Sequence, residues 1–295
     1  MPKASVILNP CAGSVRELDE LVKQIERLPG AEVHMTTKAG SAARLARAAL
    51  RNGSNMIVAA GGDGTLNEVI NGIQENSGDA CVGLIPLGTG NDFARTIGLP
   101  TDFEAAIEVL RAGHTRDVDL VRVTSDEVRY FLNVSAGGFS GLVNEKLTPE
   151  LKKTWGPLAY LRSAAAALPD LRAYRTTLAF DNTESLMLDL YNVVVANGRY
   201  VGGGTLIAPE ASIDDGLLDI ILIQKRSAPE LALLAAQVAV GAHLSSDAVV
   251  FRRAAKVTVN SKPGMWFNVD GELVGNEPAT FEILPRALRF VVPKP

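Results

Sequence analysis

Hydrophobic and polar positions follow two different periods along the first part of the chain. Short apolar runs such as Ala4–Leu8 and Asn55–Ala60 are typical of buried strands. Between these runs, apolar residues recur every three or four positions, as in residues 18–28 and 41–50, which is the period of a helix with one buried face. The alternation of strand and helix predicts a parallel sheet with helices on its faces.

The same patterns define further elements in this part of the chain. We expect strands at Ala4–Leu8, Val33–Thr36, Asn55–Ala60 and Val82–Ile85, and helices at 18–28, Ser41–Leu50, Thr65–Gln74 and 104–110. Ser14 and Glu17 have the spacing of a capping box, and Thr101 with Glu104 repeats it. Both pairs therefore predict the start of a helix.

Beyond about Val118 the pattern changes to short β-rich runs. We expect strands at Arg129–Ser135, Thr176–Phe180, Leu188–Ala196, Leu217–Ile223, Lys256–Asn260, Met265–Val269, Thr280–Leu284 and Leu288–Val292, with helices at Pro149–Leu168 and Pro229–His243. This composition predicts an antiparallel sandwich or barrel. The fold class is therefore α/β plus β: an α/β nucleotide-binding domain over residues 1–122, which the C-terminal tail is free to join, and a β-sandwich substrate domain over residues 123–295.

The segment Gly61–Glu68, Gly-Gly-Asp-Gly-Thr-Leu-Asn-Glu, follows an apolar strand and opens a helix. Glycines let a backbone approach a phosphate closely, and a helix N-terminus supplies free N–H groups. A plain strand-to-helix turn needs fewer glycines, so phosphate binding is the favoured interpretation. Neither the P-loop nor the Rossmann spacing is present. Asp63 within the loop indicates a divalent cation that bridges it to the phosphates.

Two further turns have the same strand-to-helix context. The first is Pro86–Ala94, in which Thr89 can bind a phosphate or a base and Asp92 can share the cation with Asp63; Asn91 or Asp92 as a simple helix cap is the alternative. The second is Asn9–Gly13. Ligands of open α/β sheets bind outside the carboxyl ends of the strands, so the three turns are expected to converge on one nucleotide.

A family resemblance rests on these turns and on three segments further along. The matching segments are Asn-Pro-x-Ala-Gly at 9–13, Gly-Gly-Asp-Gly-Thr-x-Asn-Glu at 61–68, Pro-Leu-Gly-Thr-Gly-Asn-Asp-Phe-Ala at 86–94, Asn-Gly-x-x-x-Gly-Gly-Gly at 197–204, Asp-Gly-Leu-Leu-Asp at 215–219 and Asp-Gly-Glu at 270–272. Together they resemble the diacylglycerol kinase catalytic superfamily, and most closely its bacterial YegS-type lipid kinases. NAD kinases and phosphofructokinases share the Gly-Gly-Asp-Gly segment, so the implied first domain is similar to theirs.

The resemblance implies specific roles for residues of this chain. It implies a nucleotide site made of Asn9, Thr36, Gly61, Gly62, Asp63, Gly64, Thr65, Leu66, Asn67, Glu68, Gly88 and Thr89, where Thr37 matches as well as Thr36. It implies Asp270 as the base, and Asp63, Asp92 and Asp119 as the acids that hold the catalytic magnesium. Glu272 lies two residues after Asp270, so we expect it to face the same side and assist. It also implies a structural Mg²⁺ or Ca²⁺ bound by Asp215 and by the carbonyls of Ser212 and Leu217. Local sequence alone leaves Asp270 open as an ordinary Asp-Gly hairpin turn.

Net charge, cysteine content and hydrophobic segments limit which partners and which compartment we expect for this chain. A formal net charge of −4 argues against nucleic acid as a partner. Cys11 and Cys81 are interpreted as buried thiols of a reducing compartment. No signal peptide and no apolar run long enough for a transmembrane helix is apparent, so we expect a cytoplasmic protein that contacts membranes peripherally. The oligomeric state stays open, a homodimer included.

The expected reaction is ATP-dependent phosphorylation of a lipid hydroxyl, with phosphatidylglycerol favoured over diacylglycerol as the acceptor. The apolar helices near 149–168 and 231–240 are expected to pack on the core, with contact to a membrane surface as the alternative. Two other functions are considered: a kinase of a soluble substrate such as NAD, and a catalytically silent nucleotide sensor. The turn at 86–94 and the Asp-Gly-Glu near the C-terminus argue against the first, and Asp270 argues against the second.

Overall fold

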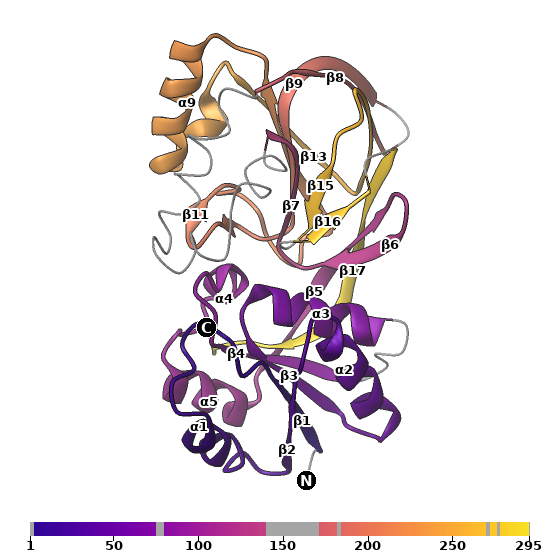
Figure 1. Cartoon of the computed structure of the whole chain (residues 1–295). Coiled ribbons are helices and arrows are strands. Elements are labelled where there is room, and N and C mark those ends of the chain that lie inside the picture. Colours follow the sequence, from indigo (N-terminus) through magenta and orange to yellow (C-terminus); the bar gives the residue numbers. More distant parts are fainter. Residues whose placement is uncertain are drawn as a thin grey trace. The chain divides into compact units, whose positions relative to one another are not determined.

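The computed structural model describes residues 3–74, 80–139, 171–181, 184–269, 272–275 and 278–294. The chain divides into two compact units (Figure 1). The first comprises Met1–Val118 together with Arg286–Pro295, and the second comprises Asp119–Pro285.

The first unit is a parallel sheet between helices. Its elements are β1 (Ala4–Leu8), α1 (Leu18–Ile25), β2 (Ala31–Met35), α2 (Ser41–Arg51), β3 (Met56–Gly61), α3 (Asp63–Ile73), β4 (Cys81–Pro86), α4 (Asp92–Thr96) and α5 (Phe103–Ala112). The strand order is β2-β1-β3-β4, every pair is parallel, and the last residues of β17 (Ala279–Val291) add a parallel strand beside β4. The predicted parallel α/β fold of this part of the chain is confirmed.

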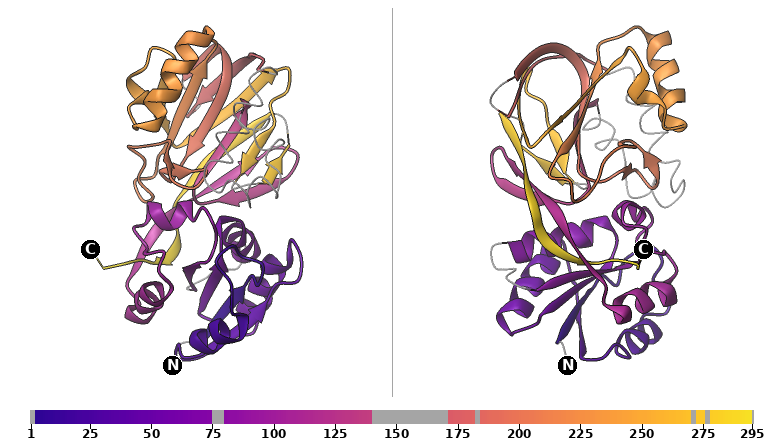
Figure 2. Two further views of the ribbon diagram at one scale, coloured as in Figure 1. Left: turned by 60° about the vertical axis from the view of Figure 1, so that its left-hand side comes forward. Right: turned by 180° about the vertical axis from the view of Figure 1, so that it is seen from behind.

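Two pairs of helices cover the two faces of this sheet. Helices α1 and α5 pack on one face against Leu8, Val58 and Ile85, while α2 and α3 lie on the other face (Figures 1 and 2). Each such fully buried aliphatic side chain contributes about 1.5–3 kcal/mol to the free energy of unfolding. A Cβ at Gly72 of α3 would lie 2.3 Å from the carbonyl oxygen of Ala43, so this glycine allows α2 and α3 to touch through their backbones.

The second unit is built from antiparallel strands. Its elements are the part of β5 (Thr115–Thr124) from Asp119 onward, β6 (Val128–Phe131), β7 (Val134–Gly138), β8 (Tyr174–Phe180), β9 (Glu184–Ala196), β10 (Tyr200–Val201), β11 (Thr205–Leu206), β12 (Leu218–Gln224), α9 (Ala228–Ala239), the 3₁₀ turn η3 (His243–Ser245), β13 (Val249–Ala254), β14 (Lys256–Lys262), β15 (Phe267–Val269), β16 (Glu272–Val274) and the first part of β17. The strands follow the order β16-β15-β7-β9-β8-β14-β17, and β12 pairs with β9 and β13. The ring of Phe281 meets those of Phe131 and Phe267 edge to face in the core.

Neither predicted capping box forms. The Ser14 hydroxyl donates to the Leu87 carbonyl at 2.9 Å, and α1 begins after Glu17 without a side-chain cap. Helix α5 is capped instead by Asp102, whose Oδ1 accepts the N–H of Ala105 at 3.0 Å. The spacing of the sequence motif does not reveal that Ser14 donates to the distant Leu87 carbonyl. Nor does it reveal that Asp102, next to the expected cap Thr101, is the residue that caps α5.

Three other expectations are corrected by the structure. The two strands predicted at 280–284 and 288–292 are one strand, β17, which continues through Arg286 although that residue has a φ of 50°. Cys11 is exposed rather than buried; Cys81 is half-buried, and burial raises the pKa of its thiol. The third is corrected only in part: α9 packs through buried Leu234 and through Val238, as expected, but Leu233 is 61% exposed, so this helix leaves part of its apolar surface uncovered.

The predicted helix at 149–168 lies outside the described residues. Within the described residues, every helix falls short of the length and hydrophobicity that a bilayer crossing needs.

Candidate functional site

The three glycine-containing turns meet at the carboxyl edge of the parallel sheet. Asn9 follows β1 and is held against the neighbouring strand, because its N–H donates to the carbonyl of Ala60 at 2.9 Å. Its side-chain Nδ2 donates to the Thr65 hydroxyl at 3.3 Å. The Asn9–Gly13 turn is thereby held against the N-terminal turn of helix α3. This contact follows from the strand order, because β1 and β3 are neighbours in the sheet.

The turns Gly61–Glu68 and Pro86–Ala94 touch through their backbones. A Cβ on Gly88 would lie 2.5 Å from the Cα of Gly62, so a side chain at Gly88 would clash. The Leu87 N–H donates to the Gly61 carbonyl at 2.9 Å. Gly13 closes the group, because a Cβ there would lie 2.6 Å from the hydroxyl of Thr89. These glycines serve close approach between turns, independently of any ligand.

Asp63 joins two helices at this edge. It is the first residue of α3, and its carboxylate accepts the N–H of Asp92 at 3.1 Å and the N–H of Phe93 at 3.0 Å, which are the first two residues of α4. The carboxylate therefore caps α4 from another element. Asp63 is half-buried and Asp92 is buried, so the structure brings these two predicted acids together.

Asn91 holds the Gly88–Gly90 turn in shape. Its backbone is left-handed, with a φ of 51°, and its side chain makes no cap to α4. Instead, Oδ1 accepts the N–H of Gly88 at 2.9 Å and Nδ2 donates to the carbonyl of Gly88 at 2.8 Å. The alternative that the Asn91 side chain caps α4 is therefore wrong. Its hydrogen bonds instead fix the Gly88–Gly90 turn, in which Thr89 is exposed.

Glu68 has a structural contact that its place in the motif does not reveal. Its two carboxylate oxygens accept the N–H groups of Gly40 and Ala42, each at 2.9 Å, at the start of α2. This contact anchors the segment that begins at Thr36, whose own N–H donates to the Leu8 carbonyl at 2.8 Å. Thr36 is half-buried at the same sheet edge, whereas the alternative Thr37 is exposed.

The first turn of α3 divides into buried and open positions. The side chains of Thr65, Leu66 and Asn67 are all buried. Leu66 can therefore contribute to a ligand site only through its backbone. Gly64 is exposed, and a Cβ there would meet no atom within 4 Å. The open position at a helix N-terminus, beside Asp63, is where a phosphate group can approach the backbone.

The second unit holds another predicted acid, Asp119, at the start of that unit. It is fully buried, its Oδ2 accepts the N–H of Gly216 at 2.7 Å, and its N–H donates to the Ile213 carbonyl at 2.6 Å. The loop Ser212–Leu217 is therefore held to Asp119 by two hydrogen bonds. Gly216 has a φ of 74°, which favours glycine at this position.

Asp270, the predicted base, lies outside the described residues, as does Gly271. The flanking residues Val269 and Glu272 are paired across the β15–β16 hairpin.

The two predicted cation sites differ in how well their residues fit. Asp63 and Asp92 offer carboxylates beside an open helix N-terminus, a donor chemistry suited to Mg²⁺. At the other site, Asp215 already has partners: Oδ1 accepts the N–H of Leu217 at 3.1 Å, and Oδ2 pairs with the guanidinium of Arg253. A cation at Asp215 would have to compete with that arginine, which sequence reasoning did not single out. In the described part of the chain, no cluster of three or more His, Cys, Asp or Glu side chains is arranged to hold a metal.

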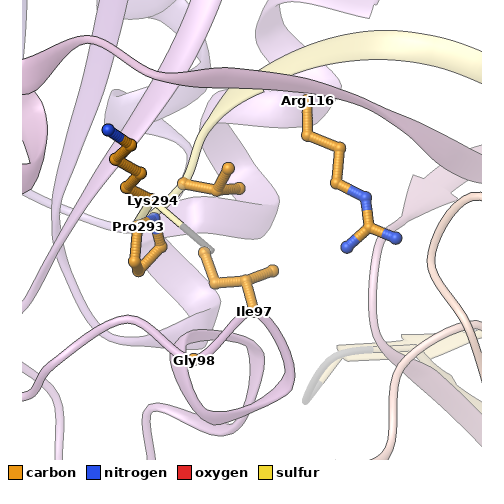
Figure 3. A pocket seen from close by; sticks show the side chains of 6 residues that line it. Ile97, Gly98, Arg116, Pro293 and Lys294 are labelled. Carbon is orange, nitrogen blue, oxygen red and sulfur yellow. The ribbon is translucent and has the colours of Figure 1, made fainter.

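A pocket of about 400 Å³ lies in the first unit (Figure 3). It is lined by Ile97, Gly98, Arg116, Val292, Pro293 and Lys294. None of its lining residues belongs to the three turns.

Two family models together match nearly the whole chain. The model described as "Diacylglycerol kinase catalytic domain" matches residues 3–123, and that described as "YegS C-terminal NAD kinase beta sandwich-like domain" matches residues 133–292. A diacylglycerol kinase of Staphylococcus carnosus is 34% identical over 99% of this chain and 95% of its own length. One of Bacillus subtilis is 33% identical over 100% of this chain and 97% of its own length.

Solved structures show the same fold. A putative diacylglycerol kinase from Bacillus anthracis superposes with a TM-score of 0.86 at 23% identity, covering 99% of this chain and 95% of that one. An NAD kinase from Archaeoglobus fulgidus in complex with ATP superposes with a TM-score of 0.52 at 16% identity, covering 98% of this chain and 93% of that one. The predicted α/β plus β-sandwich fold is therefore confirmed.

Proposed function

We propose that this chain, which belongs to the diacylglycerol kinase family, transfers the γ-phosphate of ATP to the free hydroxyl of a membrane glycerolipid. Membership of this family makes it a kinase that binds a nucleotide. Diacylglycerol is the acceptor proposed first, because the relatives at 33–34% identity carry that name. Phosphatidylglycerol, favoured by the sequence, is the second acceptor to test.

The observation that carries the proposal is the meeting of the three turns at one sheet edge. Gly62 and Gly88 touch through their backbones, and the exposed backbone of Gly64 and the hydroxyl of Thr89 belong to these two turns. We assign the phosphates of ATP to these groups, because phosphoryl transfer needs positioning and charge neutralisation more than covalent help. Asp63 and Asp92 would hold Mg²⁺, which supplies neutralising charge to the phosphates when bound.

The acceptor hydroxyl must lose a proton as the phosphorus–oxygen bond forms. We assign acceptance of that proton to the carboxylate of Asp270, with Glu272 as the supporting acid. A carboxylate suits this role, because a base within hydrogen-bond reach can orient the hydroxyl as well as deprotonate it. The bond from the γ-phosphorus to the bridging oxygen breaks at the same time, and ADP leaves.

A transfer assay with γ-³²P-ATP tests the proposal. The purified chain is given diacylglycerol or phosphatidylglycerol in mixed micelles, and NAD or a sugar in lipid-free buffer. We expect label in a lipid and a rate that falls as the micelles are diluted with detergent, because the enzyme would work at a surface. Labelled NAD or sugar with no labelled lipid would contradict the proposal, and ATP binding without transfer to any acceptor would favour a nucleotide sensor.

A further inference from the structure

Arg253 in β13 forms ion pairs with two carboxylates from different parts of the second unit. Its Nε donates to Oδ1 of Asp219 at 2.8 Å, and its Nη2 pairs with Oδ2 of Asp215. Asp219 lies in β12 directly opposite Arg253 in the strand ladder. The position of the guanidinium is therefore set by strand pairing, and its second branch reaches the loop Ser212–Leu217.

That loop is shaped around the carboxylate of Asp215. Oδ1 of Asp215 accepts the N–H of Leu217 at 3.1 Å, which closes a tight turn over Gly216. The N–H of Gly216 in turn donates to the fully buried carboxylate of Asp119 at 2.7 Å. Whatever neutralises Asp215 thus also steadies the turn that holds Asp119.

We propose that the guanidinium of Arg253 is the resident cation of the loop Ser212–Leu217, and that this loop needs no bound metal ion. A planar guanidinium can donate in two directions and carries its charge at every accessible pH. Here it spans one loop carboxylate and one strand carboxylate. A divalent ion at Asp215 would approach this fixed positive charge closely, which is electrostatically unfavourable.

The burial of Asp219 explains why the arginine is needed. Asp219 is 1% exposed, and burial raises the pKa of its carboxyl although the Arg253 guanidinium opposes that rise. Loss of Arg253 would leave this buried carboxylate without its ion-pair partner and Asp215 without its counter-charge. Removing one member of a buried pair is strongly destabilising.

Thermal unfolding of the full chain tests the proposal independently of its lipid acceptor. We compare wild type, Arg253→Gln, Asp215→Asn and the matched control Arg252→Gln, each in EDTA and in millimolar Mg²⁺ or Ca²⁺ without nucleotide. Arg252 is the adjacent strand residue and makes an exposed pair with Glu184 at 3.3 Å. We expect an unchanged wild-type Tm in EDTA, a Tm lower by about 5 °C or more in Arg253→Gln, and little change in Arg252→Gln.

The double variant tests whether Arg253 acts through Asp215. Adding Asp215→Asn to Arg253→Gln should restore part of the lost Tm, because it removes an acid that has lost its counter-charge. Strictly additive losses would overturn the proposal. So would a Tm of Arg253→Gln equal to that of Arg252→Gln, or a loss of Tm in EDTA that wild type shows and Asp215→Asn does not.

Discussion

The carboxylate of Asp63 accepts the backbone N–H of Phe93 at 3.0 Å, across 30 residues of chain. With the second bond, from the N–H of Asp92, it links the N-terminus of α3 to that of α4. The acid assigned to the nucleotide's metal ion is therefore also a helix cap. Loss of its side chain has to be examined for both effects.

Asp63→Ala is expected to reduce both stability and turnover. Loss of the cap should lower the free energy of unfolding by about 1–2 kcal/mol, and loss of the metal-holding carboxylate should lower kcat by about 100-fold or more. Denaturant unfolding and the phosphate-transfer assay measure the two effects. Asp102→Ala is the matched control, because it removes the side-chain cap of α5 and should cost similar stability with activity retained. Equal losses of activity in both variants would contradict the role of Asp63 in transfer.

Gly64→Ala is expected to spare the fold and weaken ATP binding. The added Cβ meets no protein atom within 4 Å, and alanine is at least as stable as glycine in a helix. We expect an unchanged or slightly raised Tm and an affinity for ATP at least about tenfold lower by calorimetry, because the methyl group would occupy the space assigned to a phosphate.

Gly88→Ala provides the contrast to Gly64→Ala. Its Cβ would lie 2.5 Å from the Cα of Gly62, so the turns must separate and the apo protein should lose Tm. If Gly64→Ala binds ATP as tightly as wild type, the phosphate assignment at α3 is wrong.

Asp270→Asn should separate nucleotide binding from transfer. A general base is needed only when the lipid hydroxyl reacts, so the Kd for ATP should stay close to that of wild type while kcat falls by about 100-fold or more. Calorimetry and the transfer assay provide the two readouts. Asp247→Asn, an exposed position in the second unit, controls for loss of one acid. Near-wild-type kcat in Asp270→Asn would remove Asp270 from the mechanism.

His243 should make the chain less stable in mild acid. The ring is 1% exposed, its Nε2–H donates to the Ile207 carbonyl at 2.7 Å, and its Nδ1 has no hydrogen-bond partner among the described residues. Burial lowers the pKa of His243 below its ordinary value of 6.5. Between that lowered pKa and about 6.5, the unfolded chain binds a proton that the folded chain does not, so stability falls as pH decreases through this window.

Denaturant unfolding at neutral and mildly acidic pH measures this effect. His243→Gln should lose less stability than wild type between the two conditions, whereas His114→Gln, at an exposed position, should respond as wild type does. The same loss in wild type and His243→Gln would assign the acid sensitivity to other groups.

The order of elements was readable from the sequence because burial is periodic. The apolar run of β3 predicts a buried strand, and the spacing of apolar residues up to Ile25 predicts a helix with one buried face. Strands and helices that alternate along the chain in this way predict a parallel sheet with helices on both sides, as the structure has it. The single strand β17 was missed because Pro285 and Arg286 look like a turn. In the structure β17 pairs with β14 before these residues and with β4 after them, and the strand runs through Arg286 although its φ is 50°. The predicted cap at Ser14 was wrong for a similar reason. The Ser14 hydroxyl donates to the carbonyl of Leu87, which is too far along the chain for the local sequence pattern to reveal.

The sequence by itself determined the fold class, the placement of three glycine-containing turns after parallel strands, and the family, because these depend on residue type, local spacing and motif. Only the tertiary structure decided what the polar side chains of those turns do. Glu68 caps α2, Asp63 caps α4, and Arg253 neutralises Asp215, each through a partner 26 to 38 residues away. Hydrogen bonds and ion pairs of this kind depend on which strand ends become neighbours in space, and that is set by packing of the whole sheet rather than by any periodicity along the chain.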